Sequence, residues 1–228
     1  MDKPWEHADW YDLHDTTWTA GSEREPEHYR ETLLALPPLD ADDHLIDVGA
    51  GTGKLSALIA NGYPRLGRVT LIEPNTDKLE RAEAKLKKSL PESKIETLAS
   101  ALGVGHILPE REATLVTVGS VLMPVMELRG GTLSDGLAWL RRSLEEIHAM
   151  LQPGGWGYLI ETLAAPWAGG SLDDPVRRLN MLEFVSEITQ AGFERVECVY
   201  RFRDRVAIRG QRNASWLIAG KVEQTNSL

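Results

Sequence analysis

Residues 44–63 read HLIDVGAGTGKLSALIANGY, a short apolar run followed by three glycines at alternate positions and then by a second apolar pattern. The apolar run fits a buried strand, and the pattern that begins at Lys54 has the spacing of a helix. Gly49, Gly51 and Gly53 let the chain turn sharply between the two, because glycine adopts backbone angles that other residues avoid. The segment predicts a strand–turn–helix unit. Its glycines either only form the turn, or they also form a surface on which a ligand lies.

Strand-like and helix-like patterns alternate along the rest of the chain. Strands are predicted at 44–49, 68–74, 94–100, 113–120, 155–162, 194–202 and 214–222, and helices at 26–39, 54–63, 76–90, 135–151 and 180–191. Alternation favours a parallel sheet with helices on both faces. Only a turn-rich link joins the last two strands, which favours an antiparallel pairing. We therefore expect an α/β fold with a doubly wound, mostly parallel seven-stranded sheet and one antiparallel edge strand.

The charge balance narrows the choice of partners. The 228 residues include 25 Lys and Arg against 34 Asp and Glu, a formal net charge of -9. Nucleic-acid binding depends on neutralising phosphates with basic side chains, so this balance disfavours a DNA or RNA partner. The single cysteine, Cys198, excludes an internal disulfide and fits a reducing compartment. No apolar run is long enough to span a membrane and no signal-peptide pattern is present, so we expect a cytoplasmic protein.

The ends of the predicted parallel strands are the places to look for ligand contacts, because ligands of open parallel sheets bind there. Glu73 ends the second strand, twenty residues after Gly53, where a carboxylate can accept hydrogen bonds from both hydroxyls of a ribose. A dinucleotide fingerprint would need glycine at position 54, where this chain has Lys54. A ribose contact without a pyrophosphate site indicates a nucleoside cofactor that lacks phosphates.

With these features the chain resembles the class I S-adenosylmethionine-dependent methyltransferases. The family's first motif corresponds to LIDVGAGTG (45–53), its second-strand acid to LIEP (71–74), and a later signature to MLQPGGWGYLI (150–160). The predicted pair of final strands matches the antiparallel end of the family's sheet. The resemblance spans about residues 30 to 222. It implies S-adenosylmethionine as the cofactor and S-adenosylhomocysteine as its product.

The resemblance also implies which residues contact the cofactor. Gly49, Gly51 and the adjoining backbone would lie against the methionine moiety and the ribose. Asp47 would support the loop and reach, directly or through water, towards the cofactor's amino group, and Glu73 would bind the ribose hydroxyls. The full set of expected cofactor contacts is Asp47, Gly49, Ala50, Gly51, Gly53, Glu73, Pro74, Ser100, Ala101 and Ser120.

The adenine end of this set departs from the family pattern. Many relatives carry an acidic residue followed by a small one after the third strand, where this chain has Ser100 and Ala101. The usual contact with the adenine amino group is therefore in doubt, although the Ala101 N–H could still serve the base. Pro74 would lie along the adenine, and Ser120 would lie near the methyl group.

The exit from the fourth strand, GSVLMP (119–124), excludes several subclasses. Relatives that methylate the amino groups of adenine or glutamine carry Asn or Asp, Pro, Pro and an aromatic residue here, and this chain does not. Metal-dependent relatives place acidic ligands at the ends of the fourth and fifth strands, but Gly119 and Ser120 supply none and Glu161 alone holds a divalent ion poorly. We expect no metal. Val121, Leu122 and Met123 form an apolar wall where many relatives have a histidine.

An aromatic N-terminal segment could close over the site. Residues 1–28 carry Trp5, Trp10, Tyr11 and Trp18, and we predict that they form a lid on a methyltransferase domain at 29–222, with a polar disordered tail at 223–228. These rings could equally pin the segment to the domain. His14 is the candidate general base, against the alternative that it is an exposed surface histidine. The residues expected to contact the acceptor are Tyr11, Trp18, Met123, Glu161 and Trp167.

These expectations combine into one primary function. The chain is predicted to transfer a methyl group from S-adenosylmethionine to an oxygen or nitrogen atom of a small organic acceptor, without a metal and mainly by alignment and exclusion of water. A general base is needed only if the acceptor must lose a proton. Two alternatives stay open: a protein or RNA acceptor, and a cofactor-binding module without methyl transfer. The sequence does not give the oligomeric state.

Overall fold

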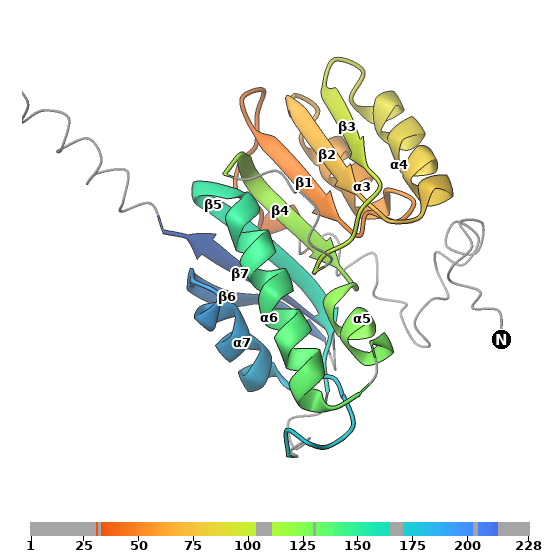
Figure 1. Ribbon diagram of the computed structural model, residues 1–228. Helices are drawn as coiled ribbons and strands as arrows, with labels where there is room; N and C mark the ends of the chain where they lie inside the picture. Colours follow the sequence, from red (N-terminus) through yellow and green to blue (C-terminus); the bar gives the residue numbers. More distant parts are fainter. Residues whose placement is uncertain are drawn as a thin grey trace, which may run out of the picture.

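The computed structural model describes residue 31 and residues 33–103, 111–129, 131–164, 171–202 and 205–213. These ranges form a seven-stranded sheet in the order β3-β2-β1-β4-β5-β7-β6, with helices around it (Figure 1). The strands are β1 (His44–Val48), β2 (Arg68–Ile72), β3 (Lys94–Leu98), β4 (Ala113–Gly119), β5 (Leu151–Thr162), β6 (Phe193–Phe202) and β7 (Arg205–Arg212). The helices are α3 (Lys54–Gly62), α4 (Thr76–Ser89), α5 (Leu122–Leu128), α6 (Leu133–Met150) and α7 (Met181–Gln190). This architecture confirms the predicted α/β fold.

The order of the strands reverses between β1 and β4. From β1 the chain moves outward to β2 and β3, and it returns to β4 on the other side of β1. The strands from β3 to β5 all pair in parallel. Ligands of such sheets bind beyond the carboxyl ends of the strands, at the point of reversal. The fold therefore points to the ends of β1 and β4 as the place for a ligand.

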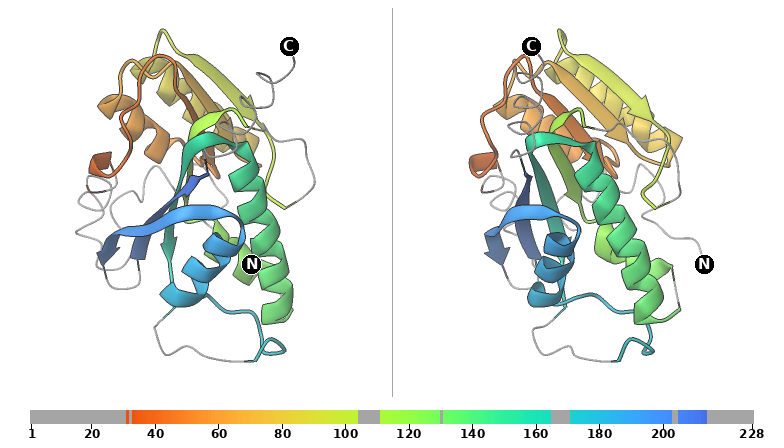
Figure 2. Two further views of the ribbon diagram at one scale, coloured as in Figure 1. Left: turned by 90° about the vertical axis from the view of Figure 1, so that its left-hand side faces the viewer. Right: turned by 60° about the vertical axis from the view of Figure 1, so that its left-hand side comes forward.

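Helices cover both faces of the sheet, as Figures 1 and 2 show from three directions. Helices α5, α6 and α7 pack on one face through an apolar cluster that includes Ile46 and Val116. Helices α3 and α4 pack on the other face through a cluster that includes Leu45 and Leu115. Neighbouring residues of one strand point to opposite faces, so β1 and β4 contribute to both clusters and are buried between them.

The last strand lies where the sequence analysis expected a turn-rich link. The antiparallel pairings predicted for one edge belong to β7, which lies between β5 and the edge strand β6 and runs antiparallel to both. The prediction of a link before position 214 was wrong, because Arg205–Arg212 is a strand. The strand predicted at 214–222 falls outside the described residues.

Strand β7 was not predicted because basic side chains interrupt its apolar pattern. Arg209 forms an ion pair of 2.6 Å with Glu197 of β6, and its guanidinium carbon lies 4.9 Å from the centroid of the Trp156 ring. Val206 and Ile208, which lie between Arg205 and Arg209 in the sequence, are buried in the core. The partners of Arg209 come from other strands, so the local pattern does not show that its charge is accommodated.

Helix α5 was also not predicted. The sequence analysis expected only an apolar wall at Val121, Leu122 and Met123, and the structure folds most of it into a helix. Pro124 is compatible with this helix because it lies in the first turn, where the backbone N–H has no partner within the helix. Leu122 and Met123 are fully buried in the core.

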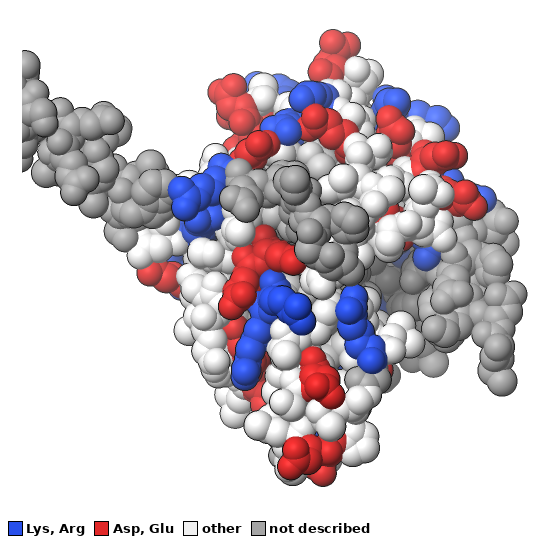
Figure 3. Space-filling view, in the orientation of Figure 1, with Lys and Arg blue, Asp and Glu red and all other residues white. Residues whose placement is uncertain are grey.

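Charges of both signs are interspersed on the face of the molecule drawn in Figure 3. In the described ranges, no helix is long and apolar enough to cross a membrane. Among those same residues, no group of three or more His, Cys, Asp or Glu side chains could hold a metal ion.

The position of β7 can be tested by truncating Ile208, which is fully buried. Ile208→Ala removes buried methyl groups and leaves a cavity, so we expect the free energy of unfolding to fall by about 2–5 kcal/mol. Leu182→Ala is the control, because Leu182 is 82% exposed and its truncation should change stability by less than about 0.5 kcal/mol. Urea denaturation measures both. An Ile208 effect as small as the Leu182 effect would contradict the assignment of a buried strand.

Candidate functional site

The loop after β1 is tied to the end of β2 by backbone hydrogen bonds. The N–H groups of Gly49 and Ala50 both donate to the Ile72 carbonyl, at 2.7 and 3.1 Å, and the Gly53 N–H donates to the Ala50 carbonyl at 2.8 Å. Gly49, Gly51 and Gly53 have φ angles of 67°, 53° and 76°, which only glycine adopts without strain. The glycines thus form a tight turn that leads from β1 into α3, as the sequence predicted.

The three glycines differ in what surrounds them. A Cβ atom at Gly49 would lie 2.2 Å from Cγ2 of Val121, and one at Gly53 would lie 2.8 Å from the Cα of Ala82 in α4. A Cβ atom at Gly51 would meet nothing within 4 Å. Gly49 and Gly53 are therefore required by packing, whereas Gly51 borders open space. Of the three glycines, Gly51 is the one that leaves backbone accessible to a ligand.

Glu73 follows β2 directly and holds this loop. Its Oε2 accepts a hydrogen bond from the Gly51 N–H at 3.0 Å, and its Oε1 accepts one from the Asn75 N–H at 3.1 Å. The side chain is mostly buried, with the residue 8% exposed. Each carboxylate oxygen has two acceptor positions, so each retains one for a further donor. A carboxylate fixed in this way suits two adjacent hydroxyl groups.

Asp47 is buried in β1 and is already bonded at both oxygens. It accepts hydrogen bonds from the hydroxyls of Ser56 in α3 and of Thr117 in β4, the latter at 2.8 Å. Burial raises the pKa of its carboxyl to about 6, the two hydroxyls act in the opposite direction, and the charge of Glu73 adds to the increase. Asp47 therefore joins β1, β4 and α3 beneath the loop. The sequence analysis did not identify Ser56 or Thr117, because neither belongs to the glycine motif.

Ser100 lies just beyond β3, beside the end of β2. The Leu98 carbonyl accepts from both the Ser100 N–H, at 2.9 Å, and the Glu73 N–H, at 3.1 Å. The next residues are fastened to α6, because the Gly103 N–H donates to the carboxylate of Glu146 at 2.7 Å. Ser100 is 5% exposed, and its Oγ has no hydrogen-bond partner among the described residues. A buried hydroxyl without a partner is costly, and this one lies at the edge of the sheet where ligands bind.

The exit from β4 carries local strain. Ser120 has a φ of 56°, in the left-handed region that favours glycine, and its N–H donates to the Ile160 carbonyl at 2.7 Å. The next residue, Val121, packs against Gly49, as the close approach of its Cγ2 shows. The ends of β1 and β4 are thereby in direct contact. Ser120 follows β4 at the point where the strand order reverses.

Glu161 and Met123 take up positions that support α5. Glu161 is 1% exposed and accepts hydrogen bonds from the N–H groups of Val121, Leu122 and Met123, at 2.9, 2.7 and 3.3 Å. Burial raises the pKa of its carboxyl to about 7, and these three bonds act in the opposite direction. Met123 is fully buried in the core. These placements favour a structural role for both residues over the predicted contact with an acceptor.

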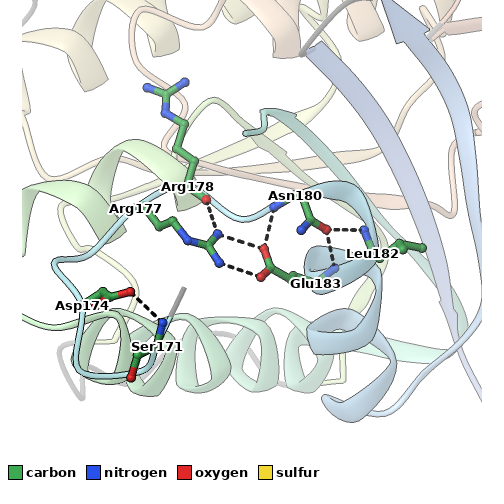
Figure 4. Close-up of polar contacts among 7 residues, drawn as sticks. All are labelled: Ser171, Asp174, Arg177, Arg178, Asn180, Leu182 and Glu183. Carbon is green, nitrogen blue, oxygen red and sulfur yellow. Dashed lines mark hydrogen bonds and ion pairs between the residues drawn. The ribbon is translucent and has the colours of Figure 1, made fainter. Parts of the chain in front are cut away.

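Arg177 and Arg178, in the segment before α7, hold that segment against the end of β5 through hydrogen bonds. Arg177 forms two hydrogen bonds with the Glu183 carboxylate, at 3.0 and 2.7 Å, and the Arg178 guanidinium points away from this pair (Figure 4). Arg178 donates to Glu127 of α5 at 3.0 Å and to the Thr162 carbonyl at 3.3 Å. Both arginines are therefore used in holding α5, β5 and α7 together.

Several predicted site residues fall outside the described ranges. They are Tyr11, His14, Trp18 and Trp167. The described ranges hold two histidines, and neither lies at the carboxyl ends of the strands. His44 begins β1 and bonds to the Thr70 hydroxyl at 2.8 Å, and His148 in α6 packs against the Phe193 ring. The described part of the chain thus brings together Asp47, the glycine loop, Glu73, Ser100 and Ser120.

Comparisons with known proteins agree with this geometry. A family described as a methyltransferase domain matches residues 46–159, half of the chain. A release factor glutamine methyltransferase of Koribacter versatilis (strain Ellin345) is 27% identical over 168 residues, which cover 68% of this chain and 56% of that protein.

Solved structures with the same fold include two methyltransferases. The S-adenosylmethionine-dependent methyltransferase SibL, in its apo form, has a TM-score of 0.59 at 16% identity and covers 82% of this chain and 55% of its own. Human N-acetylserotonin methyltransferase in complex with S-adenosylmethionine has a TM-score of 0.55 at 19% identity, covering 82% and 52%. The chain therefore spans a little over half the length of each of these relatives.

The burial of Asp47 gives the site a pH dependence that can be measured. The pKa of the Asp47 carboxyl is 3.8 in the unfolded chain and about 6 in the folded protein. Between these two pH values the folded protein therefore holds a proton that the unfolded chain has released. This group therefore makes stability fall as the pH rises from about 4 to about 6. Asp47→Asn removes that fall and should make the variant more stable, relative to the wild type, at about pH 7.5 than at about pH 4.5.

Urea denaturation at the two pH values measures this difference. We expect a change of about 2 kcal/mol in the variant's relative stability, since one pKa unit corresponds to about 1.4 kcal/mol. Asp173 is exposed, and the hydrogen bond that it makes to Ser171 comes from its backbone N–H, so Asp173→Asn should shift the relative stability by less than about 0.5 kcal/mol. If both variants show the same pH profile, the burial argument for Asp47 is wrong.

Proposed function

Because this chain belongs to the methyltransferase-domain family, we propose that it transfers the methyl group of S-adenosylmethionine to an oxygen or nitrogen atom of a small organic acceptor. The observation that carries the proposal is the pairing of Glu73 with the glycine loop. Its carboxylate is fixed by the N–H groups of Gly51 and Asn75 and keeps one acceptor position on each oxygen. This arrangement fits the two hydroxyls of a ribose.

The residues around Glu73 fit the rest of the cofactor. Gly51 borders open space, so the methionine moiety and ribose could lie against its backbone. We assign the base of the cofactor to Ser100 and Ala101, which follow β3 beside Glu73, since the N–H groups of Ser100 and Glu73 share the Leu98 carbonyl. Asp47 supports the loop by joining β1 to β4 and α3 through hydrogen bonds. In this assignment Gly49, Ala50 and Gly53 shape the loop.

Methyl transfer requires the protein mainly to align the cofactor with the acceptor. S-adenosylmethionine supplies a methyl group on a positively charged sulfur atom, which a nucleophile attacks in line. Ser120 and Val121 lie beside the glycine loop at the exit of β4, where they would border the methyl group. The apolar side chain of Val121 would exclude water there, and holding the reactants aligned supplies much of the rate enhancement. Only an acceptor that must lose a proton requires a base.

The acceptor proposal differs from the activity in the name of the bacterial relative. That protein is named a release factor glutamine methyltransferase. The family resemblance implies Asn or Asp, Pro, Pro and an aromatic residue after the fourth strand in relatives that methylate glutamine. This chain has Ser120, Val121, Leu122 and Met123 there, with Leu122 and Met123 buried in the core. The glutamine-methylating motif is thus absent from this stretch, which supports an acceptor other than glutamine. A different protein acceptor is the second candidate, favoured by the similarity to that relative.

The N-terminal segment completes the proposal. Residues 1–28 would close over the methyltransferase domain at 29–222, with Tyr11 and Trp18 against the acceptor and His14 as its base. Trp167 would line the same space. The aromatic content of the segment and the absence of a histidine at the strand ends of the described residues support this assignment. We place the reaction in the cytoplasm, since a chain with one cysteine has no internal disulfide.

Glu73 provides the direct test of cofactor binding. Glu73→Ala removes both free acceptor positions and leaves the N–H groups of Gly51 and Asn75 without their acceptor. We expect the affinity for S-adenosylhomocysteine to fall at least about 30-fold, since a hydrogen bond to a charged group contributes roughly 1.5–3 kcal/mol. Isothermal titration calorimetry measures it. Glu80→Ala on the exposed side of α4 is the matched control and should bind as the wild type does. Equal affinities in the two variants would refute the assignment.

The acceptor class can be tested with a cofactor that carries a radioactive methyl group. We expect label to enter small phenolic or amine compounds from a cell extract, and to do so equally with and without EDTA, because no metal takes part. Fractionation of the extract into small molecules, protein and RNA identifies the class. Label found only in protein would instead support the second candidate, and label only in RNA would exclude both.

A further inference from the structure

Glu161 is a buried carboxylate that binds the exit of β4, beside the site proposed for the cofactor. It lies near the end of β5 and is 1% exposed. Its Oε1 accepts hydrogen bonds from the N–H groups of Val121 and Leu122, and its Oε2 accepts one from the Met123 N–H at 3.3 Å. A carboxylate can bind all three because both of its oxygens only accept. The ionised form of Glu161 therefore fixes the start of α5.

The residue that precedes these N–H groups has a strained backbone. Ser120 has a φ of 56°, and such a conformation of a residue other than glycine persists only where the surrounding structure enforces it. The Ser120 N–H is bound to the Ile160 carbonyl at 2.7 Å, and the following N–H, that of Val121, is bound to Glu161 at 2.9 Å. Both acceptors belong to β5. The bonds to β5 therefore enforce the shape of the β4–α5 corner, which consists of Ser120 and Val121.

The β4–α5 corner packs against the glycine loop. A Cβ atom at Gly49 would lie 2.2 Å from Cγ2 of Val121, so the Val121 side chain fills the space next to Gly49. The Gly49 N–H is bound to the carbonyl of Ile72, the residue before Glu73, at 2.7 Å. Closely packed groups transmit a displacement to their neighbours. A movement of Val121 therefore reaches the loop on which the proposed cofactor lies.

Protonation of Glu161 disrupts its bonds to α5. A protonated carboxyl keeps one oxygen that only accepts and carries a hydrogen on the other, where that hydrogen meets an N–H group. Burial raises the pKa of Glu161 to about 7, while the three N–H groups and the charge of Arg178 act in the opposite direction. The carboxyl therefore loses its proton mainly between about pH 6 and about pH 8.

The charged groups on the elements around Glu161 are bound elsewhere or lie far along the fold. Arg178 donates to Glu127, the one charged residue of α5, at 3.0 Å. β4 has no charged residue, and Val206, which pairs with Glu161 in β7, is apolar. His148 lies in the last turn of α6, which leads into the start of β5, at the other end of that strand. The neighbouring helices form ion pairs of their own, Arg141 of α6 with Glu187 of α7 and Arg177 with Glu183 of α7.

We propose that Glu161 is a positioning residue for the cofactor: its ionised carboxylate holds the β4–α5 corner against the glycine loop, and its protonation releases the corner and weakens cofactor binding. The inference rests on the proposed function, which places the cofactor on that loop. Binding and protonation are then linked. A ligand that binds the ionised form better shifts the protein towards that form and expels the proton.

Isothermal titration calorimetry with S-adenosylhomocysteine tests this linkage. If only the ionised form binds, the apparent dissociation constant equals the intrinsic one divided by the ionised fraction, so with a pKa of about 7 it should be about tenfold higher at about pH 6 than at about pH 8. At about pH 7 half of the free protein is protonated, so binding should release about half a proton. Titrations in two buffers with different heats of ionisation measure that release.

Glu161→Gln keeps the shape of the side chain but accepts at one oxygen only, as the protonated carboxyl does. We expect this variant to bind at about pH 8 as weakly as the wild type does at about pH 6, with less than about a threefold change between the two. Glu187→Gln is the matched control, because Glu187 is also a buried carboxylate but binds Arg141. It should keep the wild-type pH dependence. Asp47 and the ligand are unchanged throughout, so their own titration cancels between variants.

Val121→Ala separates the corner from the loop without changing Glu161. It removes the side-chain atoms that contact Gly49 and keeps the backbone N–H that Glu161 binds. We expect the change in affinity between about pH 6 and about pH 8 to fall below about threefold in this variant. The alanine variant adds no volume, so it remains informative if Glu161→Gln disturbs the fold.

Three outcomes would overturn the inference. They are wild-type affinities that are equal at the two pH values, a Glu161→Gln or Val121→Ala variant with the pH dependence of the wild type, and a Glu187→Gln variant that loses this dependence. A role of Glu161 in stability alone predicts the second outcome. Each leaves the proposed function intact as long as the wild type binds S-adenosylhomocysteine. If the wild type binds it at neither pH, the proposed function and this inference fail together.

Discussion

The hydrogen bond from the Gly51 N–H to the Glu73 carboxylate, 3.0 Å long, is the contact on which the proposed site depends. It joins the loop after β1 to the end of β2 and turns one carboxylate towards the only one of the three loop glycines that borders open space. The other two glycines are held by packing against Val121 and against α4. Because the loop is fixed on both sides, Glu73 can present its remaining acceptor positions without any rearrangement.

The chain uses its other buried carboxylates for support. Asp47 joins β1 to Thr117 of β4 and to Ser56 of α3, and Glu161 caps α5. Burial raises the pKa of both groups, to about 6 and about 7, while the hydrogen bonds that each carboxyl accepts act in the opposite direction. The described residues therefore supply the contacts proposed for the cofactor. The contacts proposed for the acceptor, in the N-terminal segment and at Trp167, lie outside the described residues.

The glycine turn, the end of β2 and the parallel strands of the α/β fold could be predicted because their signals are local: glycine spacing, apolar runs and proline or glycine stops. Helix α5 could not, because it depends on Glu161, forty residues away, accepting the N–H of Val121. Strand β7 could not, because the charge of Arg209 is accommodated by Glu197 and Trp156 on other strands. Ser100 could be predicted as a cofactor contact from its position after the third strand, but the burial of its hydroxyl has no sequence signal.

A crystal structure with S-adenosylhomocysteine bound would test the central claim most directly. The account predicts both ribose hydroxyls within about 3.2 Å of the Glu73 carboxylate oxygens and the sulfur atom facing Ser120 and Val121. A nucleoside bound away from Glu73, or a sulfur atom turned from the exit of β4, would contradict it.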